Sequence, residues 1–357
     1  MSVFYPTMGL QPVTASGHRP AKDKIETPQM KAWIIESFDG IDKARLAEVP
    51  DPRPAAGEAL LKVSFAALNP ADAYLAQGQY PAKPPLPHIL GRDGMGQIIE
   101  LGAGVSNLRV GQKQVVLRGE VGITRWGTFA QLVSVPVESL VDVPQGWTDQ
   151  QAAGATLVYL TAYQAITQWP DLPPQAVILI SGASGGVGVA STQLALAMGH
   201  TVVGLSRDPV KRQKLKSLGM HYVLDPTDPQ WLATLKALLG ERRVDLVIDN
   251  IGGSLFAELL ATLADRGRVS VVGRLAGPVP QFNTASLLFR RIRIGGVAVG
   301  TYTNAEARQA WNQILVLLSR INARPLVDRV FAFDQLPDAF AYLARGPMGK
   351  VLLAVGE

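Results

Sequence analysis

The sequence predicts an α/β protein in which a β-rich domain is joined to a doubly wound parallel sheet. Short strand-like segments separated by Gly and Pro turns fill residues 30–150, and strands alternate with helices after residue 151. Many short strands are typical of a barrel or sandwich, whereas alternation of strands and helices builds a parallel sheet covered on both faces. A length of 357 residues also favours two domains over one.

The composition excludes several classes of site. The chain has no cysteine, which excludes disulfides, thiolate zinc sites and cysteine nucleophiles. Its four histidines, His18, His88, His200 and His221, are scattered without metal-ligand spacing. The formal charge of +5 comes without a block of Lys and Arg interleaved with aromatics, so nucleic acid is not an expected partner.

Two further patterns bear on location. No apolar run approaches the roughly 20 residues needed to cross a bilayer. The first residues lack the charged-then-apolar layout of a secretory signal. We therefore expect a soluble, cytoplasmic protein with no membrane partner.

The first 152 residues divide into an extension and a β-rich domain. Residues 1–29 are irregular, with several prolines and a mixed-charge cluster, and periodicity begins at Met30 with MKAWII. Residues 30–152 therefore form the first predicted domain. Its strands are expected at Ala59–Leu68, Gly96–Leu101, Val115–Leu117 and Phe129–Val135.

Residues 153–323 form the second predicted domain. Its short apolar strands are expected at Val177–Ile180, Thr201–Leu205, Tyr222–Leu224, Leu246–Asp249, Val269–Val272 and Arg293–Val299. Its helices are expected at Val187–Met198, Gln230–Leu239 and Ala305–Ile321. From residue 324 the pattern is β-like again, followed by a helix at 336–343 and a strand at 351–355, so we expect residues 324–357 to complete the first domain.

A glycine-rich turn follows the first strand of the second domain. The segment from Ile180 to Gly188 reads ISGASGGVG, with Ala183 in place of the usual first glycine. Gly185 would let a dinucleotide pyrophosphate approach the backbone, and Gly188 would let the next helix pack closely on the strand. The predicted phosphate contacts are Ser184, Gly185, Gly186, Val187 and Gly188. A tight turn without a ligand is the alternative.

The end of the second strand indicates which dinucleotide would bind. Ser206 stands where an acid would hold the ribose hydroxyls of NAD, and Arg207 and Lys211 follow it. A guanidinium and an ammonium at this place favour the 2′-phosphate of NADPH. Asp208 is expected to cap the next helix, because Pro209 behind it suits a first helical position. The alternative is that both basic side chains are merely solvated.

Six segments along the chain read, in order, MKAWII, LNPADAYLAQGQYP, LGRDGMGQIIELGAGV, LVYLTAYQAI, ISGASGGVG and GPMGKVLL. Together they resemble the medium-chain dehydrogenase/reductase superfamily, and within it the zinc-free quinone oxidoreductase branch. The resemblance implies a GroES-like β domain, a Rossmann domain and an active site in the cleft between them. It also implies a homodimer, with the β-like stretch Arg293–Val299 as a candidate pairing edge.

Zinc-dependent relatives in that superfamily place a cysteine where Asn69 stands and a histidine where Arg92 stands. Both ligands are absent here, so no metal is expected. The resemblance implies NADPH-dependent hydride transfer to a small-molecule quinone, enone or other α,β-unsaturated carbonyl, a reaction that needs no metal.

The resemblance also assigns catalytic candidates. Tyr80 maps to the tyrosine of related enoyl-thioester reductases and could donate a proton, or it could simply line the substrate pocket. Asn69 could hydrogen-bond the substrate carbonyl or the nicotinamide ribose, or its Asn-Pro pair could mark an ordinary turn. Trp126 and Tyr159 could form an apolar wall of the substrate site, although core packing explains either.

The remaining cofactor candidates come from the helix after the first domain, from strand ends and from the last segment. Thr161 lies in the segment that resembles the nicotinamide-facing helix of the family. Asn250 and Gly273 follow two strands at the carboxyl edge of the sheet, where ribose and nicotinamide would lie. Lys350, in the GKVLL segment, could reach the cofactor cleft.

Two other functions stay open on this sequence. One is a zinc-free NADP-dependent alcohol dehydrogenase on the same fold. The other is a cofactor-binding protein with a non-catalytic role.

Overall fold

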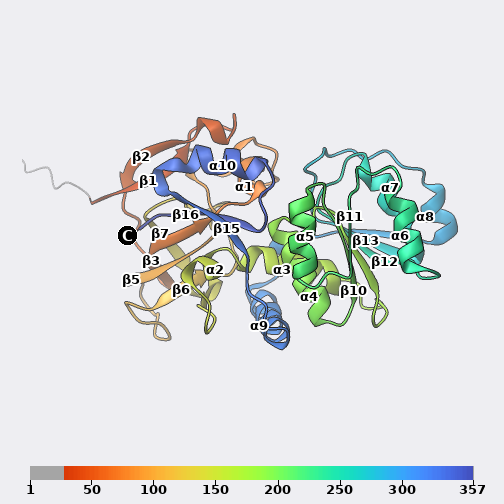
Figure 1. Cartoon of the computed structure of the whole chain (residues 1–357). Helices are drawn as coiled ribbons and strands as arrows, with labels where there is room; N and C mark the ends of the chain where they lie inside the picture. Colours follow the sequence, from red (N-terminus) through yellow and green to blue (C-terminus); the bar gives the residue numbers. More distant parts are fainter. Residues whose placement is uncertain (1–27, 357) are drawn as a thin grey trace, which may run out of the picture.

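The computed structural model describes residues 28–356. Most of the predicted extension, residues 1–27, lies outside the described residues. Figure 1 shows a β-rich domain beside a domain built around parallel strands, with helices α3 and α9 between and below them. We call them the β domain and the parallel-sheet domain.

The β domain contains two sheets. The seven-stranded sheet has the order β15-β16-β3-β5-β6-β8, with β7 paired to β3, and the three-stranded sheet has the order β2-β1-β4. Their strands are β1 (Gln29–Ile35), β2 (Arg45–Pro50), β3 (Glu58–Ala67), β4 (His88–Ile89), β5 (Asp93–Leu101), β6 (Lys113–Val116), β7 (Leu132–Pro136), β8 (Leu140–Asp142), β15 (Val327–Ala332) and β16 (Lys350–Ala354). The three-stranded sheet is a feature that the sequence reasoning did not predict.

The end of the chain returns to the β domain. Strand β16 pairs antiparallel with β3, placing Leu352 opposite Ala67 and Leu353 opposite Ala66, and β15 pairs with β16 in parallel. Leu352 and Leu353 are fully buried. The last strand is therefore part of the core of the β domain, and Lys350 is carried to the boundary with the parallel-sheet domain.

The parallel-sheet domain has six strands in the order β11-β10-β9-β12-β13-β14, all parallel. They are β9 (Val177–Ile180), β10 (Thr201–Leu205), β11 (Tyr222–Leu224), β12 (Val244–Asp249), β13 (Leu263–Val271) and β14 (Arg293–Gly296). The first strand in sequence, β9, is central, and the strand order reverses beside it. Ligands of doubly wound sheets bind at such a reversal, beyond the carboxyl ends of the strands. The predicted fold class is confirmed.

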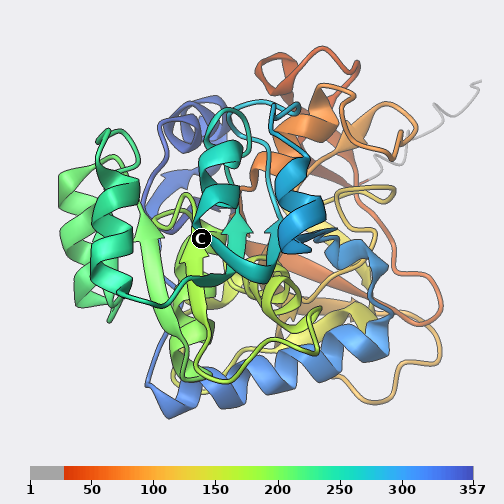
Figure 2. The same cartoon turned by 90° about the vertical axis from the view of Figure 1, so that its right-hand side faces the viewer.

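Helices cover both faces of this sheet, as Figure 2 shows. Those of the parallel-sheet domain and its boundary are α3 (Thr156–Thr167), α4 (Gly186–Ala197), α5 (Pro209–Ser217), α6 (Trp231–Leu239), α7 (Leu255–Thr262), α8 (Ala285–Arg290), η3 (Val299–Thr301) and α9 (Asn304–Arg320). Those associated with the β domain are η1 (Ile41–Lys43), α1 (Pro70–Ala76), η2 (Val137–Ser139), α2 (Asp149–Ala153), η4 (Phe333–Gln335) and α10 (Leu336–Ala344). None of the helices in residues 28–356 has the length and apolar character that a membrane span requires.

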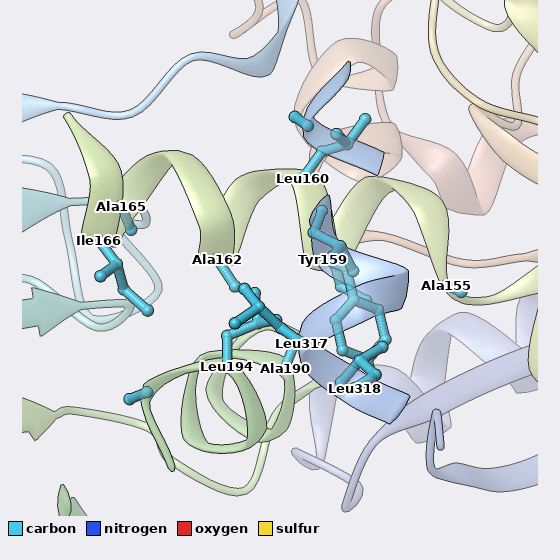
Figure 3. Close-up of a cluster of buried hydrophobic side chains, with 14 of the residues drawn as sticks. Ala155, Tyr159, Leu160, Ala162, Ala165, Ile166, Ala190, Leu194, Leu317 and Leu318 are labelled. Atoms are coloured by element: carbon cyan, nitrogen blue, oxygen red, sulfur yellow. The ribbon is translucent and has the colours of Figure 1, made fainter. Parts of the chain in front are cut away.

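Helix α3 is packed on several sides at the boundary between the domains. Ala162 meets Leu194 of α4, and Leu317 of α9 approaches the same place (Figure 3). Leu160 points away from α4 in the same view. All four side chains belong to one buried cluster that includes residues of both domains. Burial of apolar surface at this boundary therefore fixes the domains against each other.

Candidate functional site

The glycine turn joins β9 to α4 at the carboxyl edge of the parallel sheet. Gly182 takes a left-handed conformation (φ +57°), so the turn glycine is the residue before Ala183. A Cβ on Gly188 would lie 2.4 Å from the carbonyl oxygen of Gly182. Ala183 is fully buried, and its Cβ would lie 3.1 Å from a Cβ added to Gly204 of β10. Only small residues allow the strand, turn and helix to approach this closely.

The N-terminus of α4 is positioned to receive an anion. Gly185 is the N-cap, and the first N–H groups of the helix, from Gly186 to Gly188, have no intrahelical acceptor. Those N–H groups and the helix dipole favour negative charge. Ser184 and Val187 are half-buried on the same turn, and the Ser184 carbonyl accepts a 2.9 Å hydrogen bond from Gly349 N–H. The last segment of the β domain therefore borders the turn directly.

The segment after β10 carries the predicted NADPH discriminators. Ser206 is buried, with 8% of its surface exposed, whereas Arg207 is exposed. Asp208 Oδ1 accepts hydrogen bonds from Val210 N–H (2.8 Å) and Lys211 N–H (3.1 Å), which confirms the predicted cap of α5.

Two basic side chains hold this segment in place. The Lys211 ammonium donates to the carbonyl oxygen of Gly346, and so contacts the other domain. Arg212 Nη1 donates to the carbonyls of Ser206 and Arg207, each at 2.9 Å, and pairs with Asp225 at 2.8 Å. Arg212 shapes the loop backbone, a role that the sequence reasoning missed.

The carboxyl ends of β12 and β13 meet in a buried hydrogen-bond network. Ser181 Oγ donates to Asp249 Oδ1 at 2.6 Å, and Asn250 Nδ2 donates to the Ser181 carbonyl at 2.8 Å. Asn250 Oδ1 is buried without a hydrogen-bond partner among the residues that the structure describes. A Cβ on Gly273 would lie 2.4 Å from the carbonyl oxygen of Asn250. The structure thus brings Asn250 and Gly273 together and leaves Asn250 Oδ1 as an acceptor that a ligand could use.

Thr161 lies half-buried on α3, where its hydroxyl donates to the Leu157 carbonyl at 2.7 Å. This bond occupies the hydroxyl hydrogen and leaves the oxygen able only to accept. Thr161 can therefore contribute one acceptor to a ligand at the boundary.

Across the boundary, the Lys350 ammonium is enclosed by three oxygens. It donates to Asn69 Oδ1 (2.7 Å), Asp93 Oδ2 (3.1 Å) and the Leu68 carbonyl (3.1 Å). Asp93 also accepts from Thr156 Oγ1 of α3 at 3.0 Å. Lys350 and Asn69 are at most 5% exposed, and Asp93 and Thr156 are fully buried. This set, which we call the lysine network, joins β5, β16 and α3.

Asp72 lies next to the lysine network. Its Oδ2 accepts the Asn69 N–H at 2.9 Å, whereas Oδ1 has no partner within the described part of the chain. Burial raises the pKa of the Asp72 carboxyl to about 7, against the opposing pull of Arg92, the Asn69 N–H and Lys350. Asp72 is the N3 residue of a capping box on α1, so it fixes the backbone that presents Asn69.

Tyr80 is half-buried after α1, with the Arg92 guanidinium 5.2 Å from the centre of its ring. The preceding residue, Gln79, accepts two 3.2 Å hydrogen bonds from Arg274 Nη2, one at its carbonyl and one at its side chain. Arg274 directly follows Gly273 at the carboxyl end of the parallel sheet. The segment carrying Tyr80 is therefore tied to the predicted cofactor edge by a direct contact.

Two family descriptions match the chain. Residues 55–145 match the alcohol dehydrogenase GroES-like domain, and residues 186–319 match the zinc-binding dehydrogenase domain. The first range lies within the β domain and the second within the parallel-sheet domain, in the expected order. The chain belongs to the medium-chain dehydrogenase/reductase superfamily, in its quinone oxidoreductase-like branch. It is an oxidoreductase of that superfamily.

Curated relatives match over nearly the whole chain. The rat synaptic vesicle membrane protein VAT-1 homolog is 28% identical over 92% of this chain and 85% of its own length. The quinone oxidoreductase of Sus scrofa is 27% identical over 91% of this chain and 97% of its own length.

Solved structures show the same fold. A putative alcohol dehydrogenase from Sinorhizobium meliloti has a TM-score of 0.84 at 26% identity and covers 92% of this chain and 97% of its own. A mycobacterial protein complexed with NADPH has a TM-score of 0.81 at 26% identity and covers 91% of this chain and 99% of its own. The whole superfamily architecture is therefore present here.

One of the two family descriptions implies zinc, but the residues at the boundary between the two domains do not suit a zinc ion. Asn69 and Arg92 stand where zinc ligands would be expected, and the Lys350 ammonium already occupies the oxygens of Asn69 and Asp93. Residues 28–356 contain no group of three or more His, Cys, Asp or Glu side chains that could hold a metal ion.

The two candidate wall residues lie in different surroundings. Tyr159 is 1% exposed, and its hydroxyl donates to Gln193 of α4, so it packs in the core, which was the alternative to a wall role. Trp126 lines a surface pocket of the β domain with Arg53 and Arg125, and its role in a substrate wall stays a prediction.

The sequence reasoning missed Asp93 and Thr156, which complete the lysine network. It also expected Lys350 to reach toward the cofactor, whereas the structure gives its ammonium three acceptors inside the β domain. The sequence does hold a signal for Asp93, because it is a charged residue in a glycine-rich strand next to Arg92. A charged residue in a buried strand needs a partner.

Proposed function

We propose that this protein is an NADPH-dependent reductase of quinones, enones or related α,β-unsaturated carbonyls, acting by hydride transfer without a metal. The observation that carries the proposal is the contact between Arg274 and Gln79. It ties the segment that carries Tyr80 to the edge that holds Asn250 and Gly273. We take residues 30–152 with 324–357 as one domain, and residues 153–323 as the other.

The parallel-sheet domain offers the features that a dinucleotide needs. We assign the pyrophosphate to the α4 N-terminus, with its contacts at Ser184, Gly185, Gly186, Val187 and Gly188. The unpartnered Oδ1 of Asn250 and the open face at Gly273 suit the ribose and nicotinamide, and the Thr161 oxygen can accept from the carboxamide. A dinucleotide fits these residues because it supplies donors to buried acceptors and an anion to free N–H groups.

We assign NADPH rather than NADH to the residues after β10. Ser206 leaves room beside β10, and Arg207 is exposed with its guanidinium available to a 2′-phosphate. Lys211 adds positive charge nearby, although its ammonium also contacts Gly346. The mycobacterial neighbour complexed with NADPH supports this assignment.

A bound NADPH would supply the hydride, and the residues of this chain would position the substrate and deliver the proton. Lys350 donates to Asn69 Oδ1, and Asn69 Nδ2 donates one hydrogen to the Ala67 carbonyl at 3.3 Å. The second hydrogen of that nitrogen can be donated to a substrate carbonyl or to the nicotinamide ribose. Within residues 28–356 no hydrogen bond is found at the Tyr80 hydroxyl, so it is free to donate a proton to the reduced substrate.

The test is a screen of NADPH oxidation over quinones, alkenals, enones and acyl thioesters, repeated with NADH. We expect turnover with at least one quinone or enone and a clear preference for NADPH. Tryptophan fluorescence titrated with NADPH reports binding independently of turnover. Binding without turnover on any substrate would favour a non-catalytic, cofactor-binding role instead.

A zinc-free NADP-dependent alcohol dehydrogenase is the second candidate. It is favoured by the solved neighbours described as alcohol dehydrogenases, one of them NAD-dependent, with a TM-score of 0.83 at 26% identity. A screen of primary and secondary alcohols with NADP⁺ and NAD⁺ distinguishes the two functions, because an enzyme that only reduces quinones or enones should not oxidise alcohols.

We further propose a cytoplasmic homodimer. Strand β14 ends the six-stranded sheet, and Ile294 on it and Leu288 and Phe289 before it are exposed. Pairing of two β14 edges would satisfy their backbone groups and cover these side chains. Sedimentation of the wild type and of Ile294→Lys tests the pairing, and a monomeric wild type would contradict it.

A further inference from the structure

Arg92 is a half-buried cation without a fixed partner. Within residues 28–356, no hydrogen bond or ion pair is found at its guanidinium, and its nitrogens are not among the buried atoms that lack a partner. They are therefore open to solvent. The residue lies directly after Gly91 and before Asp93, whose carboxylate is held by Lys350 and Thr156. Its backbone is thus fixed by the lysine network while its side chain stays available.

The other cations at the boundary are already engaged. The Lys350 ammonium uses its three hydrogens on Leu68, Asn69 and Asp93. Arg274 spends one nitrogen on Gln79, and its guanidinium lies 4.8 Å from the centre of the Tyr74 ring. Arg92 is the remaining cation beside Tyr80, and its five N–H donors are uncommitted.

The charged groups around Arg92 leave it a net cation. Arg92 interacts electrostatically with Asp72, and burial favours the neutral form of the Asp72 carboxyl. Asp93 points instead to Lys350 and Thr156. The Tyr80 ring, 5.2 Å away, contributes a π-face rather than an anion. The guanidinium can therefore receive negative charge from a ligand.

We propose that Arg92 is a catalytic residue that binds the carbonyl oxygen of the substrate and stabilises the negative charge which develops there. This inference rests on the proposed reduction of quinones or enones, and it names the group that takes the place of a Lewis acid. Substrates are then compounds whose reduction places charge on an oxygen within reach of Arg92 and Tyr80.

The hydride brings two electrons and forms the new C–H bond at the β-carbon. The π-electron pair of the carbon–carbon double bond shifts to form the enolate, whose oxygen carries the charge that the guanidinium receives. The Tyr80 hydroxyl then gives its proton to the enolate, and solvent returns a proton to the phenolate. The substrate is reduced by two electrons as NADPH becomes NADP⁺.

The experiment compares Arg92→Met with Arg92→Lys and with the control Arg109→Met, on an exposed arginine of the same domain. Two substrates are used, a neutral quinone or enone found in the screen and its analogue bearing a carboxylate. We expect Arg92→Met to lower kcat on the neutral substrate about 100-fold, as removal of one oxyanion donor does. We expect its NADPH Kd to stay within about twofold of wild type, and Arg92→Lys to retain an intermediate kcat.

Each outcome decides between alternatives. Unchanged kcat in Arg92→Met overturns the proposal. A loss confined to KM for the carboxylate analogue also overturns it, because the guanidinium would then only anchor an anionic substituent. If circular dichroism shows that Arg92→Met does not fold, two other measurements decide. We expect Arg92→Lys to keep an intermediate kcat, and added methylguanidinium to restore activity to Arg92→Ala. If neither result is obtained, the proposal is overturned. A wild type with no turnover on any quinone or enone contradicts the proposed function itself.

Discussion

The two sides of the domain boundary are built in different ways. On the parallel-sheet side, close approach of backbone dominates: Gly182, Gly188 and Gly273 leave no room for a Cβ, and the helix end offers main-chain N–H groups. On the β-domain side, buried side chains dominate: Lys350 and Asp93 form an ion pair at 3.1 Å between residues that are at most 4% exposed.

The difference shows how each side can fail. A main-chain site tolerates changes of side chain but not added volume, because neighbouring carbonyls cannot move. A buried ion pair tolerates neither loss of a partner nor loss of a hydrogen bond, because the remaining charge is left without solvent. Substitutions on the two sides should therefore differ in their effects, and the buried ion pair should be the most sensitive place.

Lys350→Met should have the largest effect. It leaves Asp93 charged, buried and without its ion pair, and we expect a loss of about 3–5 kcal/mol in the free energy of unfolding. Urea denaturation measures the loss. The exposed Lys62→Met in the same domain is the control. Adding Asp93→Asn to Lys350→Met should recover part of the loss, and a single variant as stable as wild type would contradict the buried-pair account.

Gly188→Ala should come next. Its Cβ would lie 2.4–2.6 Å from backbone atoms of Gly182 and Ala183, so we expect a loss of about 3 kcal/mol in the free energy of unfolding. Gly185→Ala is the matched comparison, since its Cβ would meet only one carbonyl at 3.5 Å. That variant should keep its stability and lose NADPH affinity. Equal stability of the two variants would show that added volume is not what limits this turn.

Tyr80→Phe tests the chemistry of the β-domain side. Removing the hydroxyl should lower kcat about 100-fold and leave NADPH affinity within about twofold, because the group acts only as a proton donor. The ring and its contact with Arg92 remain. Steady-state kinetics and a fluorescence titration measure the two quantities. An unchanged kcat would indicate that water, and not Tyr80, donates the proton to the reduced substrate.

Ser206→Asp tests the cofactor assignment on the parallel-sheet side. A carboxylate beside Arg207 should repel a 2′-phosphate, raising the Kd for NADPH about 30-fold, or about 2 kcal/mol. The Kd for NADH should change much less. Ser206→Asn is the uncharged control of the same size. An NADPH preference that persists in Ser206→Asp would contradict the assignment of the 2′-phosphate site to this segment.

Asp72→Asn should have the smallest effect, and one that depends on pH. The folded-state pKa of Asp72, about 7, lies above its ordinary value of 3.8, so the folded chain holds a proton that the unfolded chain releases between these pH values. Wild-type stability should therefore fall as pH rises from about 4 to 7, and that dependence should be absent in Asp72→Asn. Thermal unfolding at pH 5 and pH 6 should show a relative gain of about 1 kcal/mol for the variant at the higher pH, because one pH unit inside this window is worth about 1.4 kcal/mol. The exposed Asp42→Asn serves as control, and the same pH slope in wild type and Asp72→Asn would contradict the shift.

Much of the fold could be predicted because its signals are local. The apolar run at Val177–Ile180 coincides with β9, and the Asp208-Pro209 pair marks the start of α5 with the predicted cap. The turn was placed correctly, although its left-handed residue is Gly182. In each case the residues that form the structure are neighbours in sequence.

The order of strands and helices, the two kinds of domain and the glycine turn follow from local patterns, because periodicity, caps and turns depend on residues a few positions apart. The folded chain alone shows that the Lys350 ammonium lies inside the β domain, paired with Asp93, which also accepts a hydrogen bond from Thr156. It also shows that Arg274 reaches Gln79 across the boundary. Residues this far apart in sequence share no local pattern, and they meet because the last strand pairs with β3 and apolar packing on α3 fixes the two domains together.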